Sequence, residues 1–111
     1  MAFPSKYHAK KVTVNGITFD SKKEADRYKV LSMLEQVGHI KDLKRQVKFE
    51  LIPSQKVDGK VVERPCTYVA DFTYYKGYDY IVEDVKGFKT PEYVIKRKLL
   101  LYTHGIRITE I

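Results

Sequence analysis

The spacing of apolar and polar residues changes along the chain, and these changes predict where strands and helices lie. Residues 11–19 alternate around an Asn-Gly pair, which is a strong signal for a β-hairpin. Apolar side chains then recur three and four positions apart over residues 21–37, which predicts a helix. Asp20 or Ser21 can cap this helix, and Glu24 follows Ser21 at the spacing of a capping box.

The remaining chain continues this mixture of periods. The predicted elements are one or two strands over 40–52, a polar connection over 53–65 with a turn at Asp58-Gly59, a hairpin over 66–86, a helix over 91–104 and a last strand over 106–111. The order is hairpin, helix, three or more strands, helix and strand. It predicts an α/β fold with a single domain and a mixed central sheet flanked by helices.

The hairpin over 66–86 places two aspartates close together. A turn at Gly77-Tyr78, with glycine first as a type II′ turn prefers, pairs residues whose numbers sum to 155. Asp71 then lies opposite Asp84, and a turn one residue earlier keeps both on one face. A slip of one residue in the pairing would instead place Glu83 opposite Asp71. We favour Asp84 because it shares a face with Lys86.

Alternation also assigns the other side chains of this hairpin to two faces. One face is largely apolar and is expected to meet a helix; it holds Tyr68, Ala70, Phe72, Tyr74, Ile81, Glu83 and Val85. The opposite face holds Thr67, Val69, Asp71, Thr73, Tyr80, Val82, Asp84 and Lys86. The charged groups therefore gather at one end of one face.

Two carboxylates and a lysine on one patch of sheet favour a divalent cation. Like charges that face each other across a ladder are unfavourable, and a hard cation such as Mg²⁺ neutralises them. The expected ligands are Asp71, Asp84 and the backbone carbonyl of Val85. Lys86 could orient or deprotonate a water molecule, or stabilise a charged transition state. The simpler alternative is that the aspartates are exposed and that Lys86 is their ion-pair partner.

Composition limits the remaining possibilities. The 111 residues carry 21 Lys and Arg against 14 Asp and Glu, a net charge of +7 that is compatible with binding a phosphate backbone. A single cysteine, Cys66, excludes an internal disulfide and fits a reducing cytoplasm. No run is long and apolar enough to span a bilayer, so we expect no membrane association.

Several other charged residues have two possible roles. Glu24 either closes the helix start or delivers a further acid to the metal. Lys96, Arg97 and Lys98 form either a solvated helix face or a phosphate contact, with Lys96 the best candidate. The basic N-terminal arm, which includes Lys6, His8, Lys10 and Lys11, is either a frayed terminus or a contact to a DNA backbone.

These motifs together resemble the PD-(D/E)XK nuclease superfamily, whose signature is an acid on one strand and acid-x-lysine on the next. Here the match is Asp71 followed by Asp84-Val85-Lys86, although Ala70 stands where a proline often precedes the first acid. More narrowly, the chain is similar to a family of small phage and prophage proteins of unknown function in that superfamily. The pieces that carry this likeness are FDSKKEADRY (19–28), RQVKFEL (45–51), YVADFTYY (68–75), VEDVKG (82–87) and KRKL (96–99).

The resemblance implies a restriction-endonuclease-like αβββαβ core over 20–111, preceded by an arm and hairpin over 1–19. It implies a Mg²⁺-dependent endodeoxyribonuclease, with Mn²⁺ able to substitute, and adds Glu24 to Asp71, Asp84 and Lys86 as a site residue. A phage enzyme that resolves Holliday junctions as a homodimer in the host cytoplasm is the analogous role. The alternatives are a restriction-like or nicking nuclease, or a non-catalytic DNA-binding module with this fold.

Overall fold

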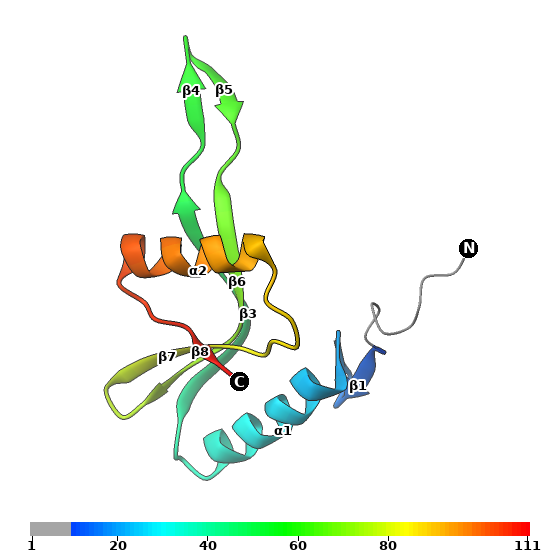
Figure 1. The fold of residues 1–111 in the computed structure, drawn as a ribbon. Helices are drawn as coiled ribbons and strands as arrows, with labels where there is room; N and C mark the ends of the chain where they lie inside the picture. Colours follow the sequence, from blue (N-terminus) through cyan, green and yellow to red (C-terminus); the bar gives the residue numbers. More distant parts are fainter. Residues whose placement is uncertain (1–9) are drawn as a thin grey trace, which may run out of the picture.

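The computed structural model describes residues 10–111, which form a mixed α/β fold (Figure 1). Two helices accompany one four-stranded sheet and two short hairpins. The elements are β1 (Val12–Val14), β2 (Ile17–Phe19), α1 (Lys22–Gln36), β3 (Lys41–Ile52), β4 (Gln55–Val57), β5 (Lys60–Glu63), β6 (Cys66–Lys76), β7 (Asp79–Asp84), α2 (Pro91–His104) and β8 (Thr109–Glu110).

The four-stranded sheet has the order β3-β6-β7-β8. Its first three strands run antiparallel to one another, and β8 lies parallel to β7. Strand β8 can run parallel to β7 because helix α2 connects the two strands and returns the chain to the end of the sheet where β7 begins. The predicted mixed central sheet is therefore confirmed. The last strand is shorter than predicted, because Ile106 and Ile108 pack into the core ahead of the two residues that pair with β7.

Both helices begin where their sequences predict. The Ser21 side chain accepts a hydrogen bond from the Glu24 N–H at 3.1 Å, and Thr90 caps α2 in the same way through the N–H of Tyr93. Gly105 ends α2 in the left-handed conformation, with φ of 68°.

The pairing predicted for the central hairpin is confirmed. Every β6–β7 pair, from Phe72–Glu83 to Lys76–Asp79, has residue numbers that sum to 155. Gly77 begins the turn with φ of 63°, as a type II′ turn requires. The alternative slip is excluded, because Glu83 pairs with Phe72.

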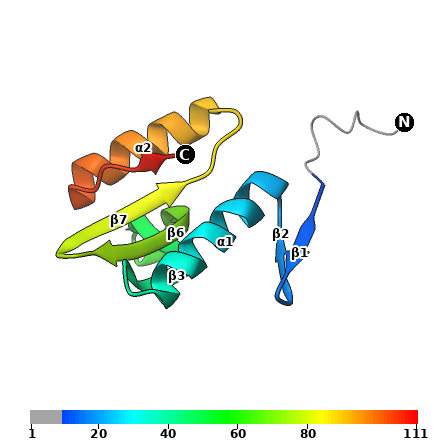
Figure 2. The ribbon, with the colours of Figure 1, turned by 90° about the horizontal axis from the view of Figure 1, so that it is seen from below.

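The core consists of two apolar clusters, and the helices lie on opposite sides of the sheet (Figure 2). On one side, Tyr93 and Leu100 of α2 pack against the sheet; on the other, Ala25 and Leu31 of α1 do so. Glu83 is fully buried on the α1 side, where the side chains of Arg27 and Tyr74 hydrogen-bond to it. Glu83 thus has a basic partner on the side of the sheet that faces α1.

The predicted faces of β6 are correct for only part of the strand. Phe72 and Tyr74 pack on the α1 side as expected, but Tyr68 and Ala70 pack with Val82 on the α2 side. The change occurs beside Gln46 of β3, which has a left-handed φ of 53° between the pairs that join β3 to residues 70 and 72. A strict period of two does not carry across such an irregularity.

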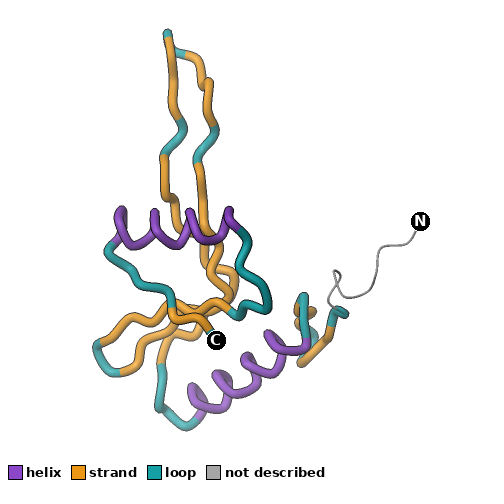
Figure 3. Tube along the Cα trace, in the orientation of Figure 1, coloured by secondary structure: helices purple, strands orange, loops and turns teal. Residues whose placement is uncertain are grey.

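The connection between β3 and β6 forms a separate finger, β4–β5, that extends away from the sheet (Figures 1 and 3). Its turn lies at Asp58-Gly59, as predicted, with φ of 52° and 79°. Neither helix of the described chain is long and apolar enough to cross a membrane.

Candidate active site

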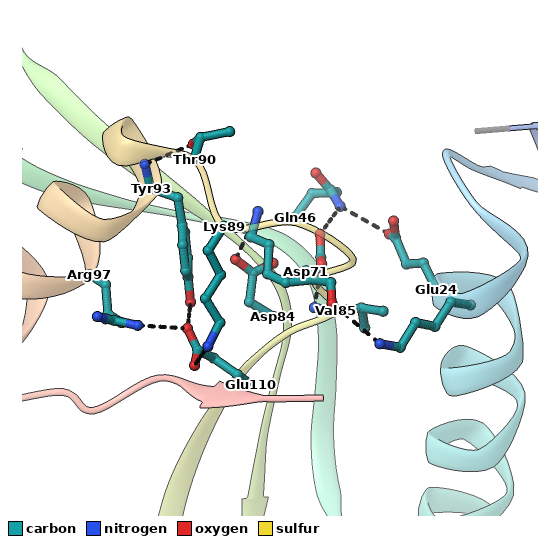
Figure 4. Close-up of polar contacts among 12 residues, drawn as sticks. Glu24, Gln46, Asp71, Asp84, Val85, Lys89, Thr90, Tyr93, Arg97 and Glu110 are labelled. Atoms are coloured by element: carbon teal, nitrogen blue, oxygen red, sulfur yellow. Dashed lines mark hydrogen bonds and ion pairs between the residues drawn. The ribbon is translucent and has the colours of Figure 1, made fainter. Parts of the chain in front are cut away.

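Asp71, in the middle of β6, and Asp84, the last residue of β7, lie side by side (Figure 4). The backbone N–H of Val85 donates to Asp71 Oδ2 at 2.9 Å, so the end of β7 is fixed against the Asp71 carboxylate. Asp84 is only 1% exposed, and Lys86 Nζ lies 3.2 Å from its Oδ2 atom. The structure thus brings together the three groups that the sequence placed on one face.

One oxygen of the Asp84 carboxylate accepts no hydrogen bond. Lys86 approaches Oδ2 closely enough for an ion pair, but its ammonium does not meet hydrogen-bond geometry, and Oδ2 has no hydrogen-bond donor. The nearby Tyr68 hydroxyl is also buried without a partner. Buried polar atoms are nearly always hydrogen-bonded, so these two atoms mark a place built for another group.

Burial, and then the neighbouring Asp84 carboxyl, raise the pKa of Asp71 to about 8, although the hydrogen bond from the Val85 N–H acts in the opposite direction. Two carboxyls this close cannot both ionise without a compensating cation. The pair therefore either shares a proton or binds a positive ion.

Glu24 reaches the same place from α1. Its backbone N–H serves the Ser21 cap, while its side chain is directed to the sheet and is 6% exposed. Burial, and to a lesser degree the charge of Asp20, raise the pKa of Glu24, whereas Arg45 lowers it from 4.0 Å away. The structure therefore places the Glu24 carboxylate beside the acid pair, in addition to the role of its backbone in the helix start.

Gln46 connects the two parts of the site. Its Nε2 atom lies 3.4 Å from Glu24 Oε2 and 3.5 Å from Asp71 Oδ1, so the amide stands between the two acids (Figure 4). A left-handed glutamine inside a long strand is uncommon, and such backbone strain is concentrated at functional sites. Gln46 lies in the RQVKFEL segment that carries the family likeness, but the strand pattern predicts no role for it, because the period of a strand does not reveal a left-handed residue.

The donor set fits a hard cation. Carboxylates and backbone carbonyls are the ligands that Mg²⁺ prefers, and Asp71, Asp84 and Glu24 supply the carboxylates. Within residues 10–111, however, no three acidic, histidine or cysteine side chains already stand in a metal-binding arrangement. The Gln46 amide stands between Glu24 and Asp71, so a shift of that amide is needed for the Glu24 carboxylate to meet the two aspartates.

A second polar cluster borders the site on the α2 side. Glu110 of β8 accepts a hydrogen bond from the Tyr93 hydroxyl at 2.6 Å and pairs with Lys89 and Arg97. Lys86 Nζ lies 4.5 Å from the centre of the Tyr93 ring, within range of a cation–π contact. Tyr93 thereby ties the last strand to the lysine of the site, a link between distant segments that the sequence pattern did not reveal.

The predicted basic residues lie in different places. Lys96 lines a hollow that also contains Lys86, whereas Arg97 is paired with Glu110, and Lys98 lines another hollow with Arg97. Lys10 and Lys11 are exposed just ahead of β1. Lys6 and His8 fall outside the described residues.

Comparison with known protein families shows one to which the chain is similar. The family described as "Protein of unknown function (DUF1064)" matches residues 4–109. The chain belongs to this family. The DUF1064 match includes both helices, the strands β3, β6 and β7, and the acids Glu24, Asp71 and Asp84. No curated protein and no solved structure matches the chain.

Proposed function

We propose that this protein is a Mg²⁺-dependent endodeoxyribonuclease that hydrolyses DNA phosphodiester bonds. The order α1, β3, β6, β7, α2, β8 supports a restriction-endonuclease-like αβββαβ core of the PD-(D/E)XK type, into which the β4–β5 finger is inserted. The acids and the lysine of that signature correspond to Asp71, Asp84 and Lys86. The net charge of +7 favours a polyanionic substrate.

The observation that carries the proposal is the Asp84 carboxylate. It is buried, stands beside a second carboxylate, and has an oxygen without a hydrogen-bond donor. A purely structural aspartate at this depth would have its lone pairs satisfied by the protein. An oxygen that has only the Lys86 ion pair and no hydrogen-bond donor can serve as a ligand of a cation.

The chain's residues would divide the work as follows. Asp71, Asp84, the Val85 carbonyl and Glu24 would hold Mg²⁺, or Mn²⁺ in its place. Bound there, the ion would supply Lewis acidity to the phosphoryl oxygens and lower the pKa of water. Lys86, whose Nζ atom lies 3.2 Å from Asp84 Oδ2, would stabilise the negative charge that develops on the phosphate.

A structure-specific role is the finer form of this proposal. The analogy to resolvases favours branched DNA, such as a Holliday junction, as substrate. Cutting both strands of a symmetric junction requires two active sites related by a two-fold axis, so a homodimer is expected in that case.

The test is cleavage of plasmid, linear and four-way-junction DNA with Mg²⁺, Mn²⁺ or EDTA. The wild type should cut with either metal and not in EDTA. Asp84→Asn and Lys86→Met should each reduce cutting at least ~100-fold while leaving the circular dichroism spectrum unchanged. Lys29→Met, on the exposed surface of α1, is the matched control and should cut normally.

Two outcomes would contradict the proposal. If both site variants cut as the wild type does, the assigned residues do not perform the chemistry. If the wild type binds DNA in a salt-dependent manner but cuts none of the three substrates with any metal, the protein is a DNA-binding module instead.

A further inference from the structure

A hollow of about 330 Å³ lies beside the candidate site, between β6 and the N-terminal end of α2. Residues from three segments contribute to its wall: the strand β6, the chain just after β7, and the first turns of α2. The polar groups that matter are Tyr68, Lys86, Thr90, Glu92, Tyr93 and Lys96. Lys86 lines the hollow and also pairs with Asp84, so its side chain stands between the hollow and the acid pair.

The wall is suited to an anion. Lys86 and Lys96 supply two ammonium groups, and each side chain is more than two-thirds buried. The N-terminal end of α2, where Thr90 caps the helix, adds the positive end of a helix dipole. These features alone are common on basic proteins, so they need a second observation.

Tyr68 provides that observation. Its side chain lines the hollow, the residue is 4% exposed, and its hydroxyl has no hydrogen-bond partner. A buried donor without an acceptor costs about 1–3 kcal/mol. The missing acceptor is what a ligand oxygen would supply.

Glu92 opposes anion binding in the free protein. Its carboxylate is 76% exposed and pairs with Lys96 at 3.0 Å, one helical turn away. This pair is weak because the Glu92 carboxylate is largely exposed. An anion that enters the hollow can therefore displace Glu92 from Lys96. Glu92 therefore gives a test of opposite sign, because its neutralisation should strengthen binding.

We infer that the hollow is a subsite for the DNA phosphate that neighbours the scissile one, bound by the Tyr68 hydroxyl and the Lys96 ammonium. This inference rests on the proposed nuclease function, and it names the part of the substrate that the enzyme holds beyond the bond it cuts. Lys86 lies between the two phosphates, at the border between the hollow and the acid pair.

The first experiment measures DNA binding by fluorescence anisotropy over a range of salt concentrations. Ca²⁺ replaces Mg²⁺, and gels confirm that the DNA stays intact. Lys96→Gln should weaken binding about tenfold at low salt and lower the salt slope by about one. Tyr68→Phe should weaken binding severalfold without changing the slope, because it removes a donor and no charge. Glu92→Gln should tighten binding.

Matched controls come from α1. Lys29 pairs with Asp26 of its own helix, as Lys96 does with Glu92. Lys29→Gln and Asp26→Asn change the net charge by the same amounts as Lys96→Gln and Glu92→Gln. Their effects on binding measure the non-specific part, which should be less than half of the effect at the hollow.

The second experiment locates the phosphate. Neutral methylphosphonates replace the phosphates around the cut site one at a time. One substitution adjacent to the scissile position should weaken wild-type binding, and the same substitution should have no further effect in Lys96→Gln. That loss of effect identifies the phosphate that Lys96 contacts.

The outcomes separate this inference from the proposed function. If the wild type cuts DNA but Tyr68→Phe and Lys96→Gln bind it as the controls do, the subsite is wrong and the nuclease stands. If Tyr68→Phe leaves DNA binding intact and weakens metal binding instead, the hydroxyl serves Asp84 and the subsite is again wrong. If the wild type binds DNA, cuts none, and the variants bind as predicted, the hollow binds a DNA phosphate but is no subsite of a nuclease, so the inference fails together with the proposed function. If the wild type binds no DNA, both fail.

Discussion

Removal of Arg27 should destabilise the fold more than any change to an exposed lysine. Arg27 of α1 donates from Nε and Nη2 to the two carboxylate oxygens of Glu83, at 2.8 and 2.6 Å. Tyr74 donates its hydroxyl to the same carboxylate, and burial followed by that carboxylate raises the pKa of Tyr74 to about 12. Because Glu83 is 0% exposed and precedes Asp84, this cluster also fixes the strand that presents the site.

The size of the effect follows from the burial of Glu83. Arg27→Met leaves the carboxylate with Tyr74 as its remaining partner, and removal of one member of a buried ion pair costs about 3–5 kcal/mol. Small domains have a total stability of about 5–15 kcal/mol, so the loss is a large share. With an unfolding entropy of about 2.1 cal/mol/K for each residue, a loss of about 4 kcal/mol over a chain of this length lowers Tm by about 17 °C.

Urea unfolding followed by circular dichroism measures this loss, provided that the slope of free energy against urea is unchanged. The matched control is Lys22→Met, which breaks the exposed pair with Asp26 at 2.9 Å and should cost less than about 1 kcal/mol. In the double variant Arg27→Met/Glu83→Leu no charge stays buried, so it should be more stable than Arg27→Met alone. A cost for Arg27→Met no larger than that of Lys22→Met would refute the reasoning.

Three further predictions concern the acids and the strained glutamine. In EDTA, the stability of the fold should decrease as pH rises from about 4 to 8, because folded Asp71 keeps a proton that the unfolded chain releases near pH 3.9. Asp71→Asn should therefore raise Tm at pH 8 and have little effect at pH 4. Hydrogen bonding from Tyr93, and then from Lys89, lowers the pKa of Glu110 to about 2, so stability should fall as pH drops from about 4.5 to 2, and thermal melts of Glu110→Gln should lack that loss. Gln46→Leu should reduce DNA cleavage about tenfold or more while urea unfolding shows a folded protein, because the amide between Glu24 and Asp71 is lost; unchanged cleavage would show that this contact has no functional role.

Much of the candidate site was predictable because it lies within one hairpin. The pairing of β6 with β7 follows from a glycine at the turn, and its register brings Asp71 close to Asp84, one step beyond the last pair, Phe72–Glu83. The sequence did not decide whether the Glu24 side chain closes the start of its helix or approaches the acids of the hairpin, since a residue at this position in a helix can do either. Packing of α1 against the sheet decided the direction of its side chain.

The sequence by itself determined the elements whose signals are local. Asn-Gly and Asp-Gly turns, a Ser cap, a Thr-Pro helix start and a terminal glycine act within a few residues, and the structure has all of them where the sequence predicts. Only the tertiary structure decided the left-handed Gln46, the exchange of faces along β6, the cluster at Glu110 and the unpartnered hydroxyl of Tyr68. Each of these depends on segments far apart in the chain, and the period of a single strand or helix contains no information about the neighbour it will meet.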